Sequence, residues 1–367
     1  MDQRLNMRLL LTAQEDWNIQ ACGLLAQGLQ DLGCEVFVAH DPFSSAISLP
    51  FTPVWKGTVL PLSPERLAIS DLTRHVDAIG VFAAPDVVAR FRETHQLACS
   101  LAGHRAVPVF SGPCHPLTGD LLEDDLLGRL GCDLLCLHGP AETEVLRELT
   151  LHSPDSAQGS VEMGLWQLPT APGKESDEAR ASKRLIFIEQ ADFPASSTNR
   201  RRLLAQIEDL AKRLPEWQII IQPDYSQPED AKSLDPSSFA RLLLTKNLKP
   251  RPELPTNLML GAEGTLPRIL ASATVSATLT SPASMAALAW GKQVMIVADY
   301  GFSSACNSQL WMGSGLVGRL AAISAEQELY ELPAMHPDWF NSIGGNIKDG
   351  AQRLLASLER LLEVSPG

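Results

Sequence analysis

The feature that most constrains the fold is a repeated alternation of short apolar runs with longer amphipathic segments. "MRLLLTA" (7–13) predicts a strand, "WNIQACGLLAQGLQDLG" an amphipathic helix that ends at Gly33, and "CEVFVA" a second strand. Strand, helix and strand in succession favour a parallel sheet with helices on its faces. The pattern continues in "VDAIGVFAA", "DVVARFRETHQLACSLAG", "AVPVFSG", "CDLLCLHG" and "PAETEVLRELTLH". We therefore predict one doubly wound α/β domain over residues 1–152.

The alternation stops between residues 153 and 183, where Ser, Pro, Gly and charged residues dominate, as in an interdomain linker. It restarts with "RLIFIEQ", "STNRRRLLAQIEDLAKRLP" and "WQIIIQPD", which predict strand, helix and strand. The later segments are "SFARLLLTK", "NLMLGAE", "LPRILASA", "VSATLT", "PASMAALAWG" and "QVMIVADYG". We predict a linker over 153–183, a second α/β domain over 184–345 and a terminal helix over 346–367.

Two α/β domains of similar size predict an architecture of two Rossmann-like domains. Folds of this kind bind ligands at the carboxyl ends of their strands, here expected in a cleft between the domains. Fold alone does not name a function, so the chemistry has to be sought at those strand ends.

Composition excludes several classes of partner. The formal net charge of −13 argues against nucleic acid, because a basic surface supplies most of that affinity. The seven cysteines lack the spacing of a zinc site, so we expect reduced thiols and no bound metal. No segment approaches the ~20 apolar residues of a membrane span, and the first residues do not form a signal peptide. We expect a cytoplasmic protein without a transmembrane segment, and a peripheral membrane contact stays open.

The junction Thr280-Ser281-Pro282 places hydroxyl groups between a predicted strand and a predicted helix. Ser281 is a favourable N-cap residue, and Pro282 suits the first helical position. The free N–H groups of a helix start, with the hydroxyls of Thr280, Ser281 or Ser284, can receive an anion such as phosphate. The same residues also suit a well-capped, buried helix that binds nothing, so both interpretations stay open at this point.

Longer motifs carry a resemblance to a known family. "TLTSPASMAALAWGKQVMIVADYG" resembles a segment of bacterial capsule-type glycosyltransferases, and more closely a family of bacterial glycosyltransferases without an assigned substrate. The likeness continues in "NSQLWMGSGLVGRL", "HPDWF", "PLSPERLA", "VPVFSGPCHP" and "CDLLCLHGPAE", and it covers nearly the whole chain in the right order. Sialyl and polysialyl transferases are more distantly similar. The resemblance implies a GT-B fold, with a nucleotide-sugar donor on the second domain and an acceptor on the first.

Carried onto this chain, the resemblance assigns the donor phosphate to Thr280 and Ser281. Ala286 stands where the family places a glutamate that binds a ribose, and an alanine side chain cannot accept a hydrogen bond. Gln293 likewise replaces a family proline. These departures imply altered donor binding or weakened catalysis.

Two further strand ends of the second domain are candidates for donor binding. Gln222 and Pro223 stand where related transferases carry a lysine or a His-Pro pair. Gln222 can donate to a phosphate or a base but brings no charge, and Pro223 equally suits a simple turn. Gln190 ends the first strand of this domain, before the helix start "SSTNRRR".

The run Arg200-Arg201-Arg202 lies in the first turns of that predicted helix. Arginines are unfavourable near a helix N-terminus because of the helix dipole. They therefore indicate either an anionic partner or a solvated face, and we favour the solvated face.

In the first domain, Glu15 and Asp16 follow the first strand, and Glu15 matches an acidic position of the family. Inverting sugar transfer needs a base that takes the proton of the acceptor hydroxyl, a role that a carboxylate here suits. Asp16 also suits a helix cap. His115 and His138 follow two later strands, where an imidazole can act as a base or bind phosphate. We predict Glu15, Asp16 and His115 as catalytic residues.

Motifs of other enzyme classes are missing. The sequence has no G-x-x-x-x-G-K-[ST] loop, no clean G-x-G-x-x-G after the first strand and no G-x-S-x-G elbow. The acidic run Glu123-Asp124-Asp125 falls in a predicted helix and is not the D-x-D motif of metal-dependent transferases. Stabilisation of a leaving phosphate by fixed dipoles, without a metal, fits the remaining residues.

The favoured function is a metal-independent glycosyltransferase with a CMP- or UDP-linked sugar as co-substrate, no other cofactor, and a glycan or lipid-linked acceptor. A sugar-nucleotide epimerase of the same architecture is an alternative enzyme, against which Ala286 counts. A non-catalytic GT-B-like protein that binds a glycan or a partner is the alternative outside the enzymes. Its support comes from the departures at Gln222, Ala286 and Gln293.

Overall fold

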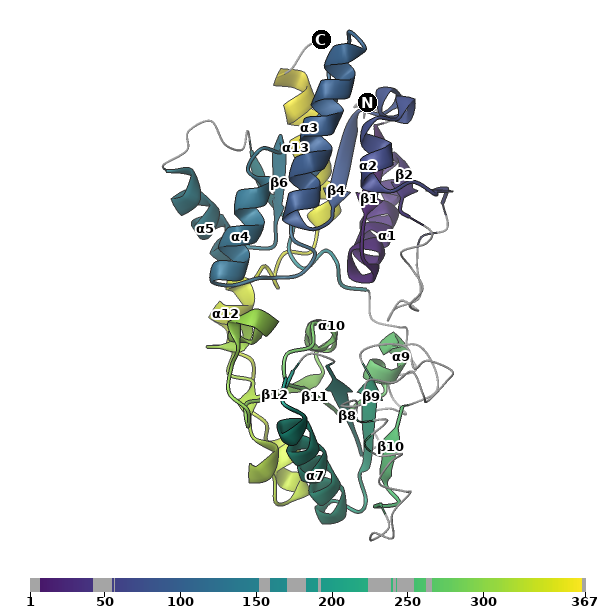
Figure 1. The fold of residues 1–367 in the computed structure, drawn as a ribbon. Helices are drawn as coiled ribbons and strands as arrows, with labels where there is room; N and C mark the ends of the chain where they lie inside the picture. Colours follow the sequence, from purple (N-terminus) through teal and green to yellow (C-terminus); the bar gives the residue numbers. More distant parts are fainter. Residues whose placement is uncertain are drawn as a thin grey trace. The chain divides into compact units, whose positions relative to one another are not determined.

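The computed structural model describes residues 7–41, 55, 57–151, 159–169, 183–190, 193–223, 239, 242, 254–261 and 266–364. The chain divides into two compact units. The first contains the described residues up to Leu168 together with those from Asp338 on, and the second contains those from Pro169 to Pro337. Each unit is built around its own parallel sheet (Figure 1).

The first unit contains a seven-stranded sheet and the helices that connect its strands. Its strands are β1 (Arg8–Ala13), β2 (Glu35–Ala39), β3 (Val59–Leu60), β4 (Ala78–Phe82), β5 (Val109–Ser111), β6 (Leu134–Leu137) and β7 (Ser160–Glu162). Its helices are α1 (Asp16–Asp31), α2 (Pro64–Ala68), α3 (Pro85–Leu101), α4 (Asp120–Arg129), α5 (Pro140–Thr150) and α13 (Gly350–Val364), with a 3-10 turn at Asp71–His75. The short α12 (Pro337–Ser342) precedes α13.

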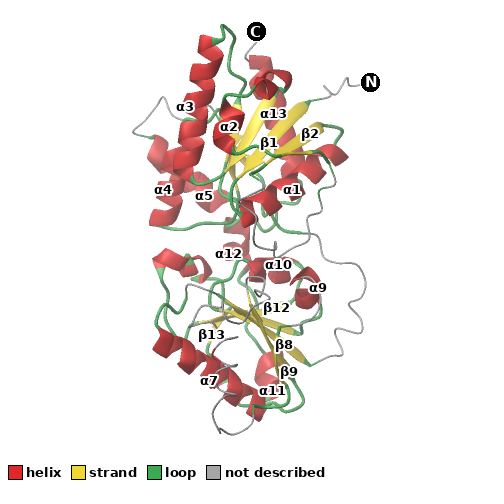
Figure 2. Cartoon of the chain, turned by 45° about the vertical axis from the view of Figure 1, so that its right-hand side comes forward, coloured by secondary structure: helices red, strands yellow, loops and turns green. Residues whose placement is uncertain are grey.

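The strands of this sheet run parallel in the order β3-β2-β1-β4-β5-β6-β7. Successive side chains of a strand point to opposite faces, so Leu9 and Leu11 enter one core cluster and Leu10 the other. Helices α1 and α13 cover the first face, and α3 and α4 cover the second (Figure 2). Burial on both faces explains why the strands are apolar throughout rather than alternating.

The last helix of the chain completes the first unit. Leu354, Leu355 and Leu358 of α13 lie in the same core cluster as Leu25 and Leu29 of α1. At the contact between the two helices Gly28 faces α13, and a Cβ added there would lie 3.1 Å from the Cβ of Ala351. Small residues at a helix contact allow a short interaxial distance. The apolar face of α13 is therefore an essential part of this core.

The second unit contains a six-stranded parallel sheet in the order β10-β9-β8-β11-β12-β13. Its strands are β8 (Arg184–Glu189), β9 (Gln218–Pro223), β10 (Leu258–Leu260), β11 (Val275–Thr278), β12 (Gln293–Val297) and β13 (Val317–Gly318). Its helices are α7 (Ser197–Arg213), α9 (Leu266–Ala271), α10 (Ala283–Ala289) and α11 (Glu326–Tyr330). Short 3-10 turns lie at Ser304–Cys306, Ser308–Trp311 and Leu320–Ala322. Counted along the unit, this is the third-second-first-fourth-fifth-sixth order of dinucleotide-binding Rossmann sheets.

The predicted fold class of two Rossmann-like domains closed by a C-terminal helix is confirmed. Two segments belong to a different unit from the one that the predicted boundaries gave them. Residues 160–162, expected in the linker, form the edge strand β7, which is too short to show a period in the sequence. Residues 338–345, expected in the second domain, belong to the first unit, where Trp339 and Phe340 are buried. The helix predicted in "SFARLLLTK" lies outside the described residues except for Phe239 and Leu242.

Candidate functional site

Both sheets reverse their strand order beside their first strand. The reversal lies between β1 and β4 in the first unit and between β8 and β11 in the second. In open α/β sheets, ligands bind outside the carboxyl ends of the strands at such a point. The predicted site residues all end or follow strands at these edges, and the structure gathers them in two sets, one in each unit.

Glu15 lies directly after β1 at the start of α1. Its side chain is exposed and makes no capping hydrogen bond to the helix, and its backbone has φ 75° and ψ 146°. Residues other than glycine rarely adopt a positive φ, and such strained positions cluster at functional sites. The Glu15 carboxylate is therefore held at the edge of the sheet without a capping role. Asp16 is the first residue of α1, and its side chain lies outside the described part of the chain.

His115 lies in the loop that follows β5. Its ring is half-buried and has no hydrogen-bond partner among the described residues. Burial lowers the pKa of His115 below its usual value, and the nearby His138 lowers it further, while Asp125 and Glu142 act in the opposite sense. The net effect favours the neutral imidazole, which is the form that can take a proton.

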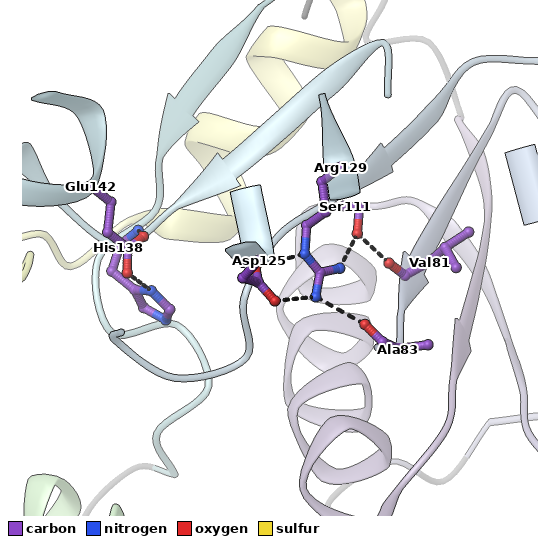
Figure 3. Close-up of polar contacts among 7 residues, drawn as sticks. All are labelled: Val81, Ala83, Ser111, Asp125, Arg129, His138 and Glu142. Atoms are coloured by element: carbon purple, nitrogen blue, oxygen red, sulfur yellow. Dashed lines mark hydrogen bonds and ion pairs between the residues drawn. The ribbon is translucent and has the colours of Figure 1, made fainter. Parts of the chain in front are cut away.

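His138 and Glu142 form a buried pair where β6 passes into α5 (Figure 3). The backbone N–H of His138 donates to one carboxylate oxygen at 2.7 Å, and the ring Nδ1 lies 2.9 Å from the other. The ring Nε2 is buried and has no hydrogen-bond partner within the described residues. Sequence reasoning considered His138 but missed its partner, although the spacing of four residues at a helix start was a usable signal.

Arg129 ties the carboxyl ends of two strands to α4 (Figure 3). Its guanidinium donates to both carboxylate oxygens of Asp125, to the Ser111 hydroxyl and to the Ala83 carbonyl, at 2.6 to 2.9 Å. The Ser111 hydroxyl donates in turn to the Val81 carbonyl. Burial alone would lower the pKa of Arg129, but the pair with Asp125 raises it. Asp125 of the acidic run thus holds an arginine inside the protein, and the strand ends that carry the candidate residues are fixed.

In the second unit, Gln190 follows β8 at the point of strand reversal. Its side-chain oxygen is buried without a partner among the described residues, and its backbone carbonyl accepts a hydrogen bond from Arg200 at 2.8 Å. Arg200 also pairs with Glu189 at 2.6 Å, with both side chains at most 2% exposed, and lies over the ring of Phe239. The solvated face expected for Arg200 is therefore wrong, whereas Arg201 and Arg202 are exposed as expected.

The position of Arg200 around the axis of α7 explains its burial. Arg200 falls on the same stripe as Leu203, Leu204 and Ile207, which all face the core. Its charge is matched inside the protein by Glu189, so it is unavailable to a phosphate. Its role is to fix the backbone at the end of β8.

The hydroxyls at the end of β11 are largely engaged within the protein. The Thr280 hydroxyl donates to the Cys306 carbonyl at 2.9 Å, and the Ser281 Oγ accepts from the Ala283 N–H at 3.2 Å. The Ser281 hydroxyl therefore hydrogen-bonds the first N–H of α10, in which Pro282 is the N-cap residue. Ser284 is fully buried, and its Oγ has no partner among the described residues.

Gln222 and Pro223 are the last two residues of β9. They pair in register with Ile188 and Glu189 of β8, so they lie at the same edge of the sheet as Gln190. The Gln222 side chain is half-buried, and that of Pro223 lies outside the described part.

The two other departures from the family pattern differ in position. Ala286 is fully buried in α10. Gln293 begins β12, so it lies at the edge of the sheet opposite to the candidate residues, and its amide donates to the Tyr330 carbonyl. The departure at Gln293 therefore leaves the candidate donor residues untouched.

Two cavities of the first unit lie at the other edge of its sheet. One, of about 220 Å³, is lined by Arg92, His95 and Arg105 and by Val109 at the start of β5. The other, of about 240 Å³, is lined by Arg8 and Glu35 at the starts of β1 and β2. Both therefore lie at the amino ends of strands and not beside the candidate site.

The described residues contain no group of three or more His, Cys, Asp or Glu side chains that could hold a metal ion. Among the same residues, no helix is both long and apolar enough to cross a membrane.

Comparison with known protein families decides the class of the chain. A family described as "Putative glycosyltransferase (DUF6716)" matches residues 57–356. The chain belongs to this family. Membership of this glycosyltransferase family confirms the resemblance inferred from the motifs and the expectation of an enzyme. No curated protein matches the sequence significantly.

Solved structures share the fold of this family member over nearly its whole length. The UDP-N-acetylglucosamine 2-epimerase of Rickettsia bellii is similar with a TM-score of 0.62 and 9% identity, over 98% of each chain. The epimerase of Neisseria meningitidis, bound to UDP-GlcNAc, has a TM-score of 0.56 and 14% identity, over 97% of this chain and 100% of its own. MurG of Acinetobacter baumannii has a TM-score of 0.51 and 12% identity, over 96% and 99%. At these identities the likeness shows the GT-B fold alone.

Proposed function

We propose that this family member transfers a sugar from a nucleotide-linked donor to a hydroxyl group of a glycan or lipid-linked acceptor, without a metal ion. The observation that carries the proposal is the strand order of the second sheet. Its reversal between β8 and β11 marks the edge of the sheet at which the predicted donor residues Gln190, Gln222 and Ser284 lie. Because a structural neighbour is bound to UDP-GlcNAc, UDP-linked donors are the first to test and CMP-linked donors the second.

The reaction forms a bond between an acceptor oxygen and the anomeric carbon and breaks the bond between that carbon and the donor phosphate. The leaving nucleotide takes the electron pair, and hydrogen-bond donors at the strand ends, which include Gln190, Gln222 and Ser284, stabilise its charge. The acceptor proton passes to a base of the first unit. The sequence predicts Glu15, Asp16 and His115 as the catalytic residues of this unit, and it also indicates His138 as a candidate base.

The first experiment is a thermal-shift panel with UDP, CMP, GDP and ADP, each with magnesium and with EDTA. A nucleotide present at about a hundred times its dissociation constant adds roughly 2.7 kcal/mol to the stability of the folded state. We expect a shift with one pyrimidine nucleotide that is the same in both conditions. A shift that requires magnesium would contradict the metal-independent reaction.

The chain offers a matched pair of variants for this binding test. Ser284 and Ser276 are both fully buried and have a hydroxyl without a partner among the described residues, but only Ser284 follows the strand end. We expect Ser284→Ala to weaken nucleotide binding about tenfold or more, since hydrogen bonds to charged groups contribute about 1.5–3 kcal/mol. Ser276→Ala should keep the parent affinity. Equal affinities in all three proteins would remove Ser284 from the donor site.

Turnover then separates the proposed function from its alternatives. Release of nucleotide from a nucleotide sugar, with transfer to water or to an added glycan, supports a transferase. Interconversion of free nucleotide sugars would identify an epimerase. Binding without any turnover would identify a non-catalytic protein.

The strained backbone at Glu15 gives a separate prediction about stability. We expect Glu15→Gly to raise the free energy of unfolding by about 1 kcal/mol, because glycine adopts this φ without the cost of about 1–3 kcal/mol borne by other residues. Glu15→Gln keeps the strain and should leave stability unchanged. Urea denaturation of the three proteins measures the difference. A Glu15→Gly protein no more stable than Glu15→Gln would show that the backbone is not strained.

A further inference from the structure

The strongest unassigned feature of the molecule is the buried pair of His138 and Glu142 in the first unit. An ionised carboxylate only accepts hydrogen bonds, so the two oxygens of Glu142 take one from the His138 backbone N–H and one from Nδ1–H. This fixes the ring in one orientation and leaves the lone pair of the neutral imidazole on Nε2. The arrangement of a base and an orienting carboxylate is the one that nucleophilic enzymes use to position an imidazole.

The neighbouring indole adds a second, independent observation. The ring of Trp166 is nearly parallel to that of His138, at 14°, with ring centroids 6.4 Å apart. Its Nε1–H is also buried and has no partner among the described residues. A buried donor and a buried acceptor without partners on neighbouring rings call for an explanation, because such groups are rare in folded proteins. A hydroxyl group accepts one hydrogen bond and donates another, so its chemistry matches both atoms.

The backbone around His138 is held by close contacts between three segments of the first unit. The His138 carbonyl accepts a hydrogen bond from the Gly164 N–H at 2.9 Å. A Cβ added to Gly344 would overlap the same carbonyl, and one added to Gly139 would overlap the backbone of Gly344. The imidazole is therefore attached to a rigid part of the fold, as a group that must be preorganised for catalysis requires.

We propose that Nε2 of His138 is the base that takes the acceptor proton, that Trp166 holds the acceptor oxygen, and that Glu142 is the positioning residue. The inference rests on the proposed function. As the acceptor oxygen bonds to the anomeric carbon, its proton moves to Nε2, the bond from carbon to donor phosphate breaks, and the nucleotide leaves with the electron pair. Glu142 stabilises the imidazolium that forms.

The test uses the full-length chain and the hydrolysis of UDP-GlcNAc or CMP-sialic acid, with water as acceptor, whichever of the two the parent protein turns over. We expect His138→Asn to lower this rate by about 10²–10⁴-fold, the range of general base catalysis, with the nucleotide dissociation constant unchanged. The matched control is His95→Asn, since His95 is a buried histidine of the same unit that lies in α3 beside Cys99. It should keep the parent rate.

Two readouts exclude a purely structural role for the pair. Added imidazole should restore part of the activity of His138→Ala, because it can occupy the vacated place. Glu142→Gln should lower the rate constant of turnover while the nucleotide dissociation constant stays unchanged, because the imidazolium that forms loses its carboxylate partner. Trp166→Phe keeps the stacked ring but removes the N–H, and it should lower the rate without changing nucleotide binding.

Failure of this inference and failure of the proposed function give different results. If His138→Asn hydrolyses the donor at the rate of the parent protein, only the assignment of the base is overturned. A buried water would then explain why His138 Nε2 and Trp166 Nε1 lack a partner among the described residues. Absence of turnover in the parent protein with both donors, despite nucleotide binding, would overturn the proposed transfer and this assignment together.

Discussion

Replacing Arg200 with methionine is expected to lower the free energy of unfolding of the second unit by about 3–5 kcal/mol, the cost of leaving one member of a buried ion pair without its partner. Arg200 and Glu189 are both almost fully buried, and their closest atoms lie 2.6 Å apart. The variant takes the Arg200 guanidinium away from the buried Glu189 carboxylate, which keeps the hydrogen bond that the Phe239 N–H donates at 2.8 Å. Hydrogen exchange resolved by peptides measures the loss, because β8 and α7 should exchange faster while peptides of the first unit keep their rates.

Two further proteins show whether charge is the cause. Arg201→Met changes an exposed residue of the same helix and should leave stability nearly unchanged. Adding Glu189→Gln to Arg200→Met removes the unpaired charge, so part of the lost stability should return. A double variant as unstable as the single one would show that lost packing, and not the unpaired carboxylate, accounts for the effect.

Replacing Gly344 with alanine is expected to destabilise the first unit by about 2–5 kcal/mol, the sum of a strained backbone and an overpacked contact. Gly344 has φ 82°, and its added Cβ would meet the carbonyl oxygen of His138, which is backbone and cannot turn aside. The measurement is the urea midpoint of the unfolding transition. Because the clash pushes on His138, turnover should fall as well, even where the variant is folded.

Gly103 provides the control for this substitution. It lies in the same unit, has φ 73°, and nothing would lie within 4 Å of its added Cβ. Gly103→Ala therefore carries the strain of a positive φ without a clash, and it should cost only about 1 kcal/mol. If the two variants are equally destabilised, the close contact at Gly344 contributes nothing.

The alternation of apolar runs was enough to predict most elements of both sheets, because strands buried on both faces form continuous apolar runs with turn residues at their ends. It failed for β7, whose three residues are too few for any period. It also misplaced the segment around Trp339 and Phe340, since nothing local in a sequence shows on which of two cores an apolar segment packs. The strand order, which identifies the edge that carries the site, follows from long-range pairing and had no local signal.

The location of the candidate site could be predicted from the sequence, but the side-chain contacts of its residues could not. Residues such as Glu15, His115 and Gln190 follow apolar runs, so the strand-end rule finds them from the sequence. The three arginines at 200–202 are the same residue type, and only their positions around the helix axis distinguish the buried Arg200 from the other two. That stripe, shared with Leu203 and Leu204, was visible in the sequence. The pairing of Arg200 with Glu189 was not, because it depends on how α7 packs against β8.

The contribution of α13 to the first unit has a consequence for how the protein is made. The ribosome synthesises the second unit, whose described residues end at Pro337, before it synthesises α13. Until the last turns of α13 emerge, the apolar face of α1 around Leu25 and Leu29 lacks the helix that covers it. Synthesis of the second unit is therefore complete before that of the first unit. A chain truncated before α13 would contain a complete second unit joined to a first unit that lacks its last helix.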